Sequence, residues 1–111
     1  MKQKIMMNLL LATSMFLVFS GAAQAEGDAA AAKEKNSMCL GCHGIPDWRT
    51  AFPTVYHVPK IGGQSEQYLI DALNQYKNGE RSHPSMKALA ESLSEQDIKD
   101  FAAYYAGAAG N

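Results

Sequence analysis

The sequence contains few residues of the kind that build metal clusters or disulfide frameworks: its 111 residues include two cysteines and three histidines. A structural zinc site takes four ligands, usually as pairs at finger-like spacing, and no second cysteine pair accompanies the first. Two of the histidines, His57 and His83, do not form a short His-x-His spacing. These absences argue against a structural zinc site. The sequence also contains no internal repeat.

The sequence has no excess of basic residues either, since ten Lys and Arg face eleven Asp and Glu. Two of the ten basic residues, Lys2 and Lys4, lie in the first 25 residues, so residues 26–111 keep eight basic and eleven acidic residues and a formal charge of −3. Binding to nucleic acid calls for a basic stripe. We therefore expect no nucleic acid among the partners.

Long apolar runs are confined to the N-terminus. Residues 1–25 have the three parts of an export signal: a positively charged start, an apolar stretch over 5–20 and a small-residue cleavage site, Ala23-Gln24-Ala25. An uncleaved membrane anchor is the alternative, but polar residues interrupt a stretch already short for a span of about 20 residues. The sequence predicts a signal peptide over 1–25, a domain over 26–111 and export to the periplasm.

The remaining chain is small, and its pattern is helical. A single domain of about 86 residues buries only a marginal apolar core, so a cofactor or a covalent staple is expected to complete it. Helical periodicity predicts helices over 29–38, 65–79 and 94–107. The predicted N-cap residues are Asp28, Ser65 and Ser94.

The segment 44–63 is the longest stretch without a helical pattern. It contains Pro46, Pro53 and Pro59, and it reads as a loop. Nothing in residues 26–111 reads as a strand. Long loops in so small a domain usually wrap something, so we expect this one to cover a bound group.

The motif Cys39-Leu40-Gly41-Cys42-His43 suggests what that group is. Two thiols three residues apart with a histidine directly after the second form the attachment signature of a c-type haem. Each thiol forms a thioether to the porphyrin, and the histidine is then placed to give a ring nitrogen to the iron. The alternatives are a redox-active dithiol or half of a zinc site, but the strand and the further ligands that those sites need are missing.

The sequence resembles the class I cytochromes c, in particular the small bacterial monohaem electron carriers. The resemblance covers nearly all of residues 26–111. The segments that carry it are the motif at 39–43, Pro59 to Gln64, Tyr76 to Arg81, a methionine before the last helix, and Leu93 to Ile98 leading into Ala102 to Ala106.

This resemblance implies an all-α cytochrome c fold, with three to four helices packed around one covalently attached haem. The first and last helices of that fold cross. Relatives often place a glycine in the first helix at the crossing, and here that position corresponds to Ala32. Alanine is small enough for a close approach, so we expect a slightly wider crossing against Phe101 or Tyr105.

The resemblance also implies the second axial ligand of the iron. Met86 corresponds to the family's axial methionine and lies in a proline-stiffened stretch between two predicted helices. His83 and His57 are the alternatives, together with an open or water-bound site. Met38 is adjacent to Cys39 and does not reach the opposite face of the ring.

Two further site residues are expected, the first of them from the resemblance. Pro59 corresponds to the residue whose carbonyl accepts a hydrogen bond from the axial histidine, here His43, and the alternative is that it merely turns the loop. Arg81 is a candidate to bind a haem propionate, as are Trp48 and Tyr76, although an arginine after a helix stop is ordinarily just solvated.

The function expected from these residues is one-electron transfer by one haem c per chain, with His43 and Met86 as axial ligands. A protein of this kind is not an enzyme, has no small-molecule substrate, and exchanges electrons with redox proteins such as a membrane oxidase, reductase or dehydrogenase. The main alternative is a cytochrome c subunit of a larger oxidoreductase. A sensor or peroxidatic haem protein is a third possibility and requires Met86 to be absent from the iron.

Overall fold

The computed structural model describes residues 26–52 and 54–107. The predicted signal peptide over 1–25 lies outside the described residues. Five helices and one two-stranded ribbon make up the described chain: α2 (Ala29–Lys35), α3 (Ser37–His43), β1 (Arg49–Thr50), β2 (Tyr56–His57), α4 (Glu66–Asn78), α5 (Pro84–Glu91) and α6 (Glu95–Gly107). None of the described helices is long and apolar enough to cross a membrane.

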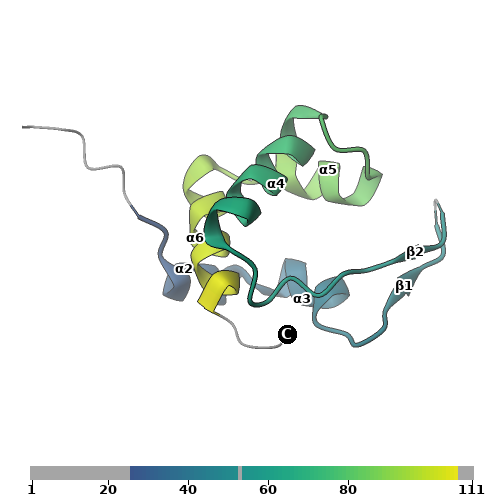
Figure 1. Ribbon diagram of the computed structural model, residues 1–111, viewed down its shortest axis with the longest axis horizontal. Helices are drawn as coiled ribbons and strands as arrows, with labels where there is room; N and C mark the ends of the chain where they lie inside the picture. Colours follow the sequence, from purple (N-terminus) through teal and green to yellow (C-terminus); the bar gives the residue numbers. More distant parts are fainter. Residues whose placement is uncertain (1–25, 53, 108–111) are drawn as a thin grey trace, which may run out of the picture.

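The helices pack in a chain of contacts around α6. Helix α6 packs against α2 and α4, and α4 packs in turn against α5 (Figure 1). The predicted crossing of the first and last helices is confirmed by the packing of α2 on α6. The hydrophobic core is small, and its buried members are Ala32, Cys39, Leu69, Leu93, Ile98, Phe101, Ala102 and Tyr105.

The predicted helix caps are observed. The Ser65 hydroxyl accepts a hydrogen bond from the Tyr68 amide at the start of α4, and Gly79 ends that helix with a left-handed φ of 80°. At the start of α6, Ser94 and Asp97 form a reciprocal capping box, with both amide bonds at 3.0 Å. These local signals therefore place α4 and α6.

The prediction of a continuous helix over 29–38 is wrong. The Asp28 carboxylate caps α2 as expected, but the helix ends at Lys35, and the Cys39 motif lies inside a separate helix, α3. At the junction, the Asn36 amide bonds to the Lys33 carbonyl three residues back, and the Asn36 side chain accepts a hydrogen bond from Tyr105. A contact with the last helix thus holds the junction.

Two further predictions need correction. The stretch before the last helix, expected to be a proline-stiffened connection, forms α5, because Pro84 occupies its first turn, where no intrahelical N–H bond is lost. The count of three to four helices is accordingly too low. The segment 44–63, expected to be strandless, contains the antiparallel pair β1–β2, in which Arg49 faces His57.

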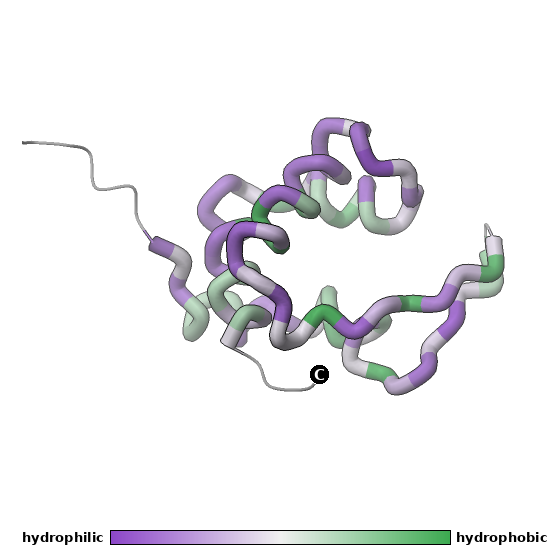
Figure 2. The backbone as a smooth tube through the Cα atoms, in the orientation of Figure 1, coloured by the Kyte–Doolittle hydropathy of each residue, from purple (hydrophilic) through white to green (hydrophobic). Residues whose placement is uncertain are grey.

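The β1–β2 hairpin projects from the helices (Figure 1). Hydrophobic residues lie at its far end (Figure 2). Phe52 and Val55 are 86% and 73% exposed there. Of the paired strand residues, Thr50 and Tyr56 line the cavity described below.

The chain that leads into α2 lies very close to α6 at Gly27. A Cβ atom at this position would lie 2.1 Å from the Lys99 carbonyl oxygen. This is a steric clash, so the position requires glycine. One turn further, Ala32 is completely buried in the same core cluster as Phe101 and Tyr105. Two small residues, Ala32 in α2 and Gly27 just ahead of it, therefore allow this part of the chain to lie close to α6, and the resemblance had indicated only Ala32.

Candidate functional site

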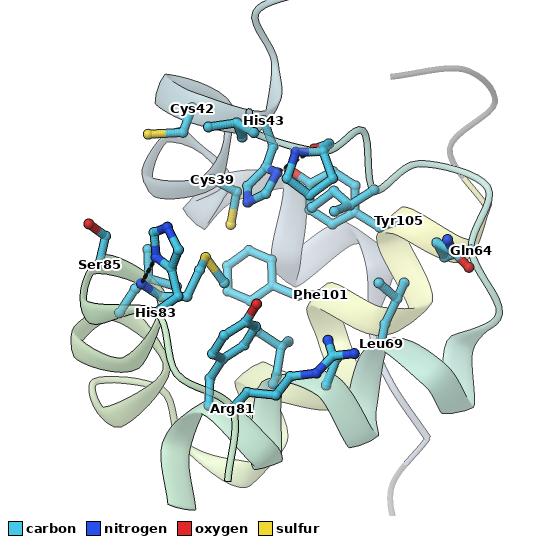
Figure 3. Close-up of a pocket in the computed structure, with 18 of the residues that line it drawn as sticks. Cys39, Cys42, His43, Gln64, Leu69, Arg81, His83, Ser85, Phe101 and Tyr105 are labelled. Carbon is cyan, nitrogen blue, oxygen red and sulfur yellow. Dashed lines mark hydrogen bonds between the residues drawn. The ribbon is translucent and has the colours of Figure 1, made fainter. Parts of the chain in front are cut away.

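A cavity of about 240 Å³ lies between α3, the hairpin, α4, α5 and α6. Its walls are mostly apolar, with Leu69, Leu73 and Phe101 among them. The predicted site residues Cys39, Cys42, His43, Pro59, Arg81 and Met86 all line it. Cys39 and His43 lie on one side of the cavity, and Arg81 and His83 face them from the other (Figure 3).

Helix α3 presents both thiols and the histidine. Both cysteines are free thiols, Cys39 buried and Cys42 exposed. Burial raises the pKa of the Cys39 thiol above its ordinary value, so the group is a neutral thiol at physiological pH. Because the motif is helical, its residues are close enough to project toward one small volume.

His43 is oriented by the loop that follows the hairpin. Its Nδ1 lies 2.7 Å from the Pro59 carbonyl oxygen, and since a carbonyl only accepts, Nδ1 carries the proton and donates. The other ring nitrogen, Nε2, is then the unprotonated one and has a lone pair to give to a metal. The expected hydrogen bond between His43 and Pro59 is therefore present in the structure.

Met86 lines the cavity from helix α5 and is half-buried. His83 lines it too, but its Nδ1 accepts a hydrogen bond of 3.4 Å from the Met86 amide. The Nδ1 lone pair of His83 is therefore engaged by the backbone of α5. His57 is on β2, does not line the cavity, and has 56% of its side chain exposed near Asp47.

Arg81 is held at the cavity by two tyrosines. Its guanidinium donates a 3.1 Å hydrogen bond to the Tyr68 hydroxyl and lies over the rings of Tyr68 and Tyr76, at 5.5 and 5.6 Å from their centroids. The hydrogen bond to Tyr68 raises the pKa of the guanidinium further, so its charge is fixed. Tyr76 is a candidate from the sequence, whereas Tyr68 gives no signal there that distinguishes it from other residues of the helix. Trp48, its other aromatic candidate, does not line the cavity.

Tyr105 closes the inner end of the site. Burial raises the pKa of its phenol, which is therefore a stable O–H donor to Asn36. Its backbone carbonyl accepts a 2.9 Å hydrogen bond from the Gly63 amide. One residue of α6 thus contacts both the junction ahead of Cys39 and the loop that carries Pro59.

No family model matches the chain. Individual proteins do match it. Cytochrome c4 of Pseudomonas aeruginosa is 40% identical over 101 residues, which are 91% of this chain and 48% of that protein. Cytochrome c-554(548) of Halomonas halodenitrificans is 40% identical over 82 residues, 71% of this chain and 94% of that protein. The solved cytochrome c4 of Acidithiobacillus ferrooxidans has a TM-score of 0.57 at 25% identity, over 77% of this chain and 52% of the other.

A helical domain whose cavity collects two thiols, a histidine with a free ring nitrogen and a methionine has the donors of a covalent haem site. The chain belongs to the cytochromes c. It spans about half the length of the cytochrome c4 relatives that it matches and nearly the whole length of cytochrome c-554(548). The group that the family implies is a covalently attached c-type haem, and the thiol and imidazole donors on the cavity wall fit it.

Proposed function

We propose that this chain transfers single electrons through one c-type haem, attached to Cys39 and Cys42 and ligated by His43 and Met86. The observation that carries the proposal is that these four residues line one apolar cavity, where the His43 Nδ1 donates to the Pro59 carbonyl and leaves Nε2 free. When bound, the haem supplies an iron that exchanges one electron between the ferrous and ferric states.

The protein's contribution begins with the orientation of the two ligands. Pro59 holds His43 by the Nδ1 hydrogen bond, which fixes the plane of the ring and raises the basicity of Nε2. Helix α5 holds Met86 on its first turns. A thioether stabilises ferrous iron more than a second imidazole does, so the histidine and methionine pair favours a high reduction potential.

The same pair accounts for the lack of an enzymatic role. If His43 and Met86 both held the iron, no coordination position would remain for a substrate. The proposed activity is outer-sphere exchange with redox proteins. The proposed compartment is the periplasm, where covalent haem attachment of this type is completed; the sequence-predicted signal peptide over 1–25 supports it.

Arg81 is proposed to bind a haem propionate. Its guanidinium has a fixed charge and a fixed position, because Tyr68 bonds it and Tyr76 lies beneath it. A guanidinium with spare N–H donors at the wall of an apolar cavity is suited to a carboxylate. The contacts with the two tyrosines support this role over that of an ordinary solvated side chain.

The ligation of the iron by Met86 can be tested directly by spectroscopy. Ferric wild-type protein should show the weak far-red absorption band of sulfur bound to iron. Met86→His should remove the band, keep six-coordinate iron and lower the reduction potential, while Met86→Ala should open the reduced protein to carbon monoxide. Met38→Leu is the matched control, since Met38 also lines the cavity, and it should keep the band.

The contrary outcome is specific. If Met86→Ala kept the native spectrum and His83→Ala abolished it, the iron would be ligated by two histidines. The reduction potential would then be low, and the role as a high-potential carrier would be withdrawn.

A further inference from the structure

The backbone around Met86 is fixed from both sides by one residue, His83. The Met86 amide donates to the His83 ring nitrogen Nδ1 at 3.4 Å, and the next amide, that of Lys87, donates to the His83 carbonyl at 2.8 Å. The peptide groups before and after the Met86 Cα atom are therefore both hydrogen-bonded to His83. This pair of bonds fixes the direction in which the Met86 side chain leaves the helix.

The His83 ring is itself held by the hairpin. Tyr56 of β2 lies against it in an edge-to-face contact, with ring centroids 4.9 Å apart and planes at 67°. Both residues line the cavity together with Met86. Pro84, next in the chain, restricts the backbone further, since proline fixes its own φ.

We propose that His83 is a positioning residue for the iron ligand: its ring nitrogen, braced by Tyr56, holds the first turn of α5 in the conformation that directs Met86 into the cavity. This proposal rests on the ligation by Met86 proposed above. It assigns to His83 a role other than that of ligand, because its Nδ1 already accepts the hydrogen bond from the Met86 amide.

An ordinary helix cap and a positioning residue make different predictions. A cap that only stabilises α5 raises the free energy of unfolding and leaves the iron environment of the folded protein unchanged. A positioning residue also shifts the equilibrium between methionine-bound and methionine-free ferric protein. That equilibrium is measured by titrating imidazole into the ferric holoprotein and following the loss of the far-red band.

The test compares variants that separate the acceptor from the ring. His83→Leu keeps side-chain volume against Tyr56 and loses the acceptor, whereas His83→Asn loses the ring and keeps an acceptor favoured at N-caps. In His83→Leu the imidazole concentration that displaces Met86 should fall about fivefold, the factor that corresponds to the loss of a typical cap. In His83→Asn it should stay within about twofold of wild type, because the acceptor is retained.

Ser65→Ala is the matched control. It removes the single side-chain cap of α4, a helix that carries neither proposed ligand. It should lower the melting temperature by an amount similar to His83→Leu and leave the far-red band and the imidazole titration unchanged. His83→Gln is a second variant that loses the cap, because glutamine is not a preferred N-cap residue. It preserves a polar side chain and replaces His83→Leu in the test if the leucine variant fails to fold, with the same change of about fivefold expected.

Three results overturn the proposal. If His83→Leu, or His83→Gln in its place, changes only the melting temperature, as Ser65→Ala does, His83 is a helix cap and nothing more. If His83→Leu keeps the wild-type titration and His83→Asn loses it, ring packing and not the acceptor is responsible. If the far-red band survives Met86→Ala, Met86 is not the iron ligand, and the role proposed for His83 is wrong as well. The first two results concern His83 alone and leave the ligation by Met86 intact.

Discussion

The phenol oxygen of Tyr105 lies 2.5 Å from Oδ1 of Asn36, and both residues are only 3% exposed. This hydrogen bond joins α6 to the point where α2 ends and α3 begins, three residues before Cys39. Because the two groups are buried, each depends on the other as its polar partner. The orientation of the haem-attachment helix is thus tied to the last helix of the chain.

Tyr105→Phe is expected to destabilise the holoprotein by about 1 to 3 kcal/mol, since it leaves the Asn36 amide oxygen buried without its donor. Denaturant unfolding measures the change in the free energy of unfolding. Tyr104→Phe is the control, because Tyr104 is the half-buried neighbour on the same helix. The double variant Asn36→Leu/Tyr105→Phe should lose less free energy of unfolding than the two single variants lose in total. Strictly additive losses would show that the two side chains are not coupled.

Ala32→Leu is expected to destabilise the protein by about 1 to 3 kcal/mol, because the added atoms overpack the crossing of α2 and α6. Ala32 is 0% exposed, and Ala29, an exposed residue of the same helix, supplies the control variant Ala29→Leu. Thermal unfolding of both variants compares the two positions. An Ala32→Leu melting temperature equal to that of wild type would place the crossing elsewhere.

Asp97 is expected to make the free energy of unfolding decrease as the pH falls below 3.8. The Lys35 ammonium, and after it Ser94, lower the pKa of this carboxyl from 3.8 to about 2 in the folded protein. The folded state thus binds the proton less readily than the unfolded state. The stabilisation by Asp97 is fully present above pH 3.8 and is lost as the pH falls toward about 2.

The measurement for Asp97 is twofold. The difference in unfolding free energy between wild type and Asp97→Asn should shrink as the pH falls through this window. An NMR titration of the Asp97 side chain should show its pKa near 2 in wild type and closer to 3.8 in Lys35→Met, because Lys35 is the largest cause of the shift. An unchanged titration in Lys35→Met would remove the ion pair from the explanation. High salt should weaken the effect, since the pair is near the surface.

The sequence by itself determined the features that depend on residues close together in the chain. The caps at Ser65 and at the Ser94 and Asp97 box are formed by side chains that bond amides three residues away, so a local pattern suffices to predict them. The haem motif is equally local, since its spacing alone presents two thiols and an imidazole on one short segment. The expected bond from His43 to Pro59 came from resemblance to a family and is present in the structure.

Only the tertiary structure decided the features that join distant parts of the chain. The helix break at Asn36 is held by Tyr105, 69 residues away, and the close approach at Gly27 is set by the Lys99 carbonyl. The position of Arg81 depends on Tyr68 in the first turn of α4, and the position of the His83 ring depends on Tyr56 of the hairpin. Such contacts leave no periodic or short-range pattern, because their energy is gained only once packing has brought the partners together.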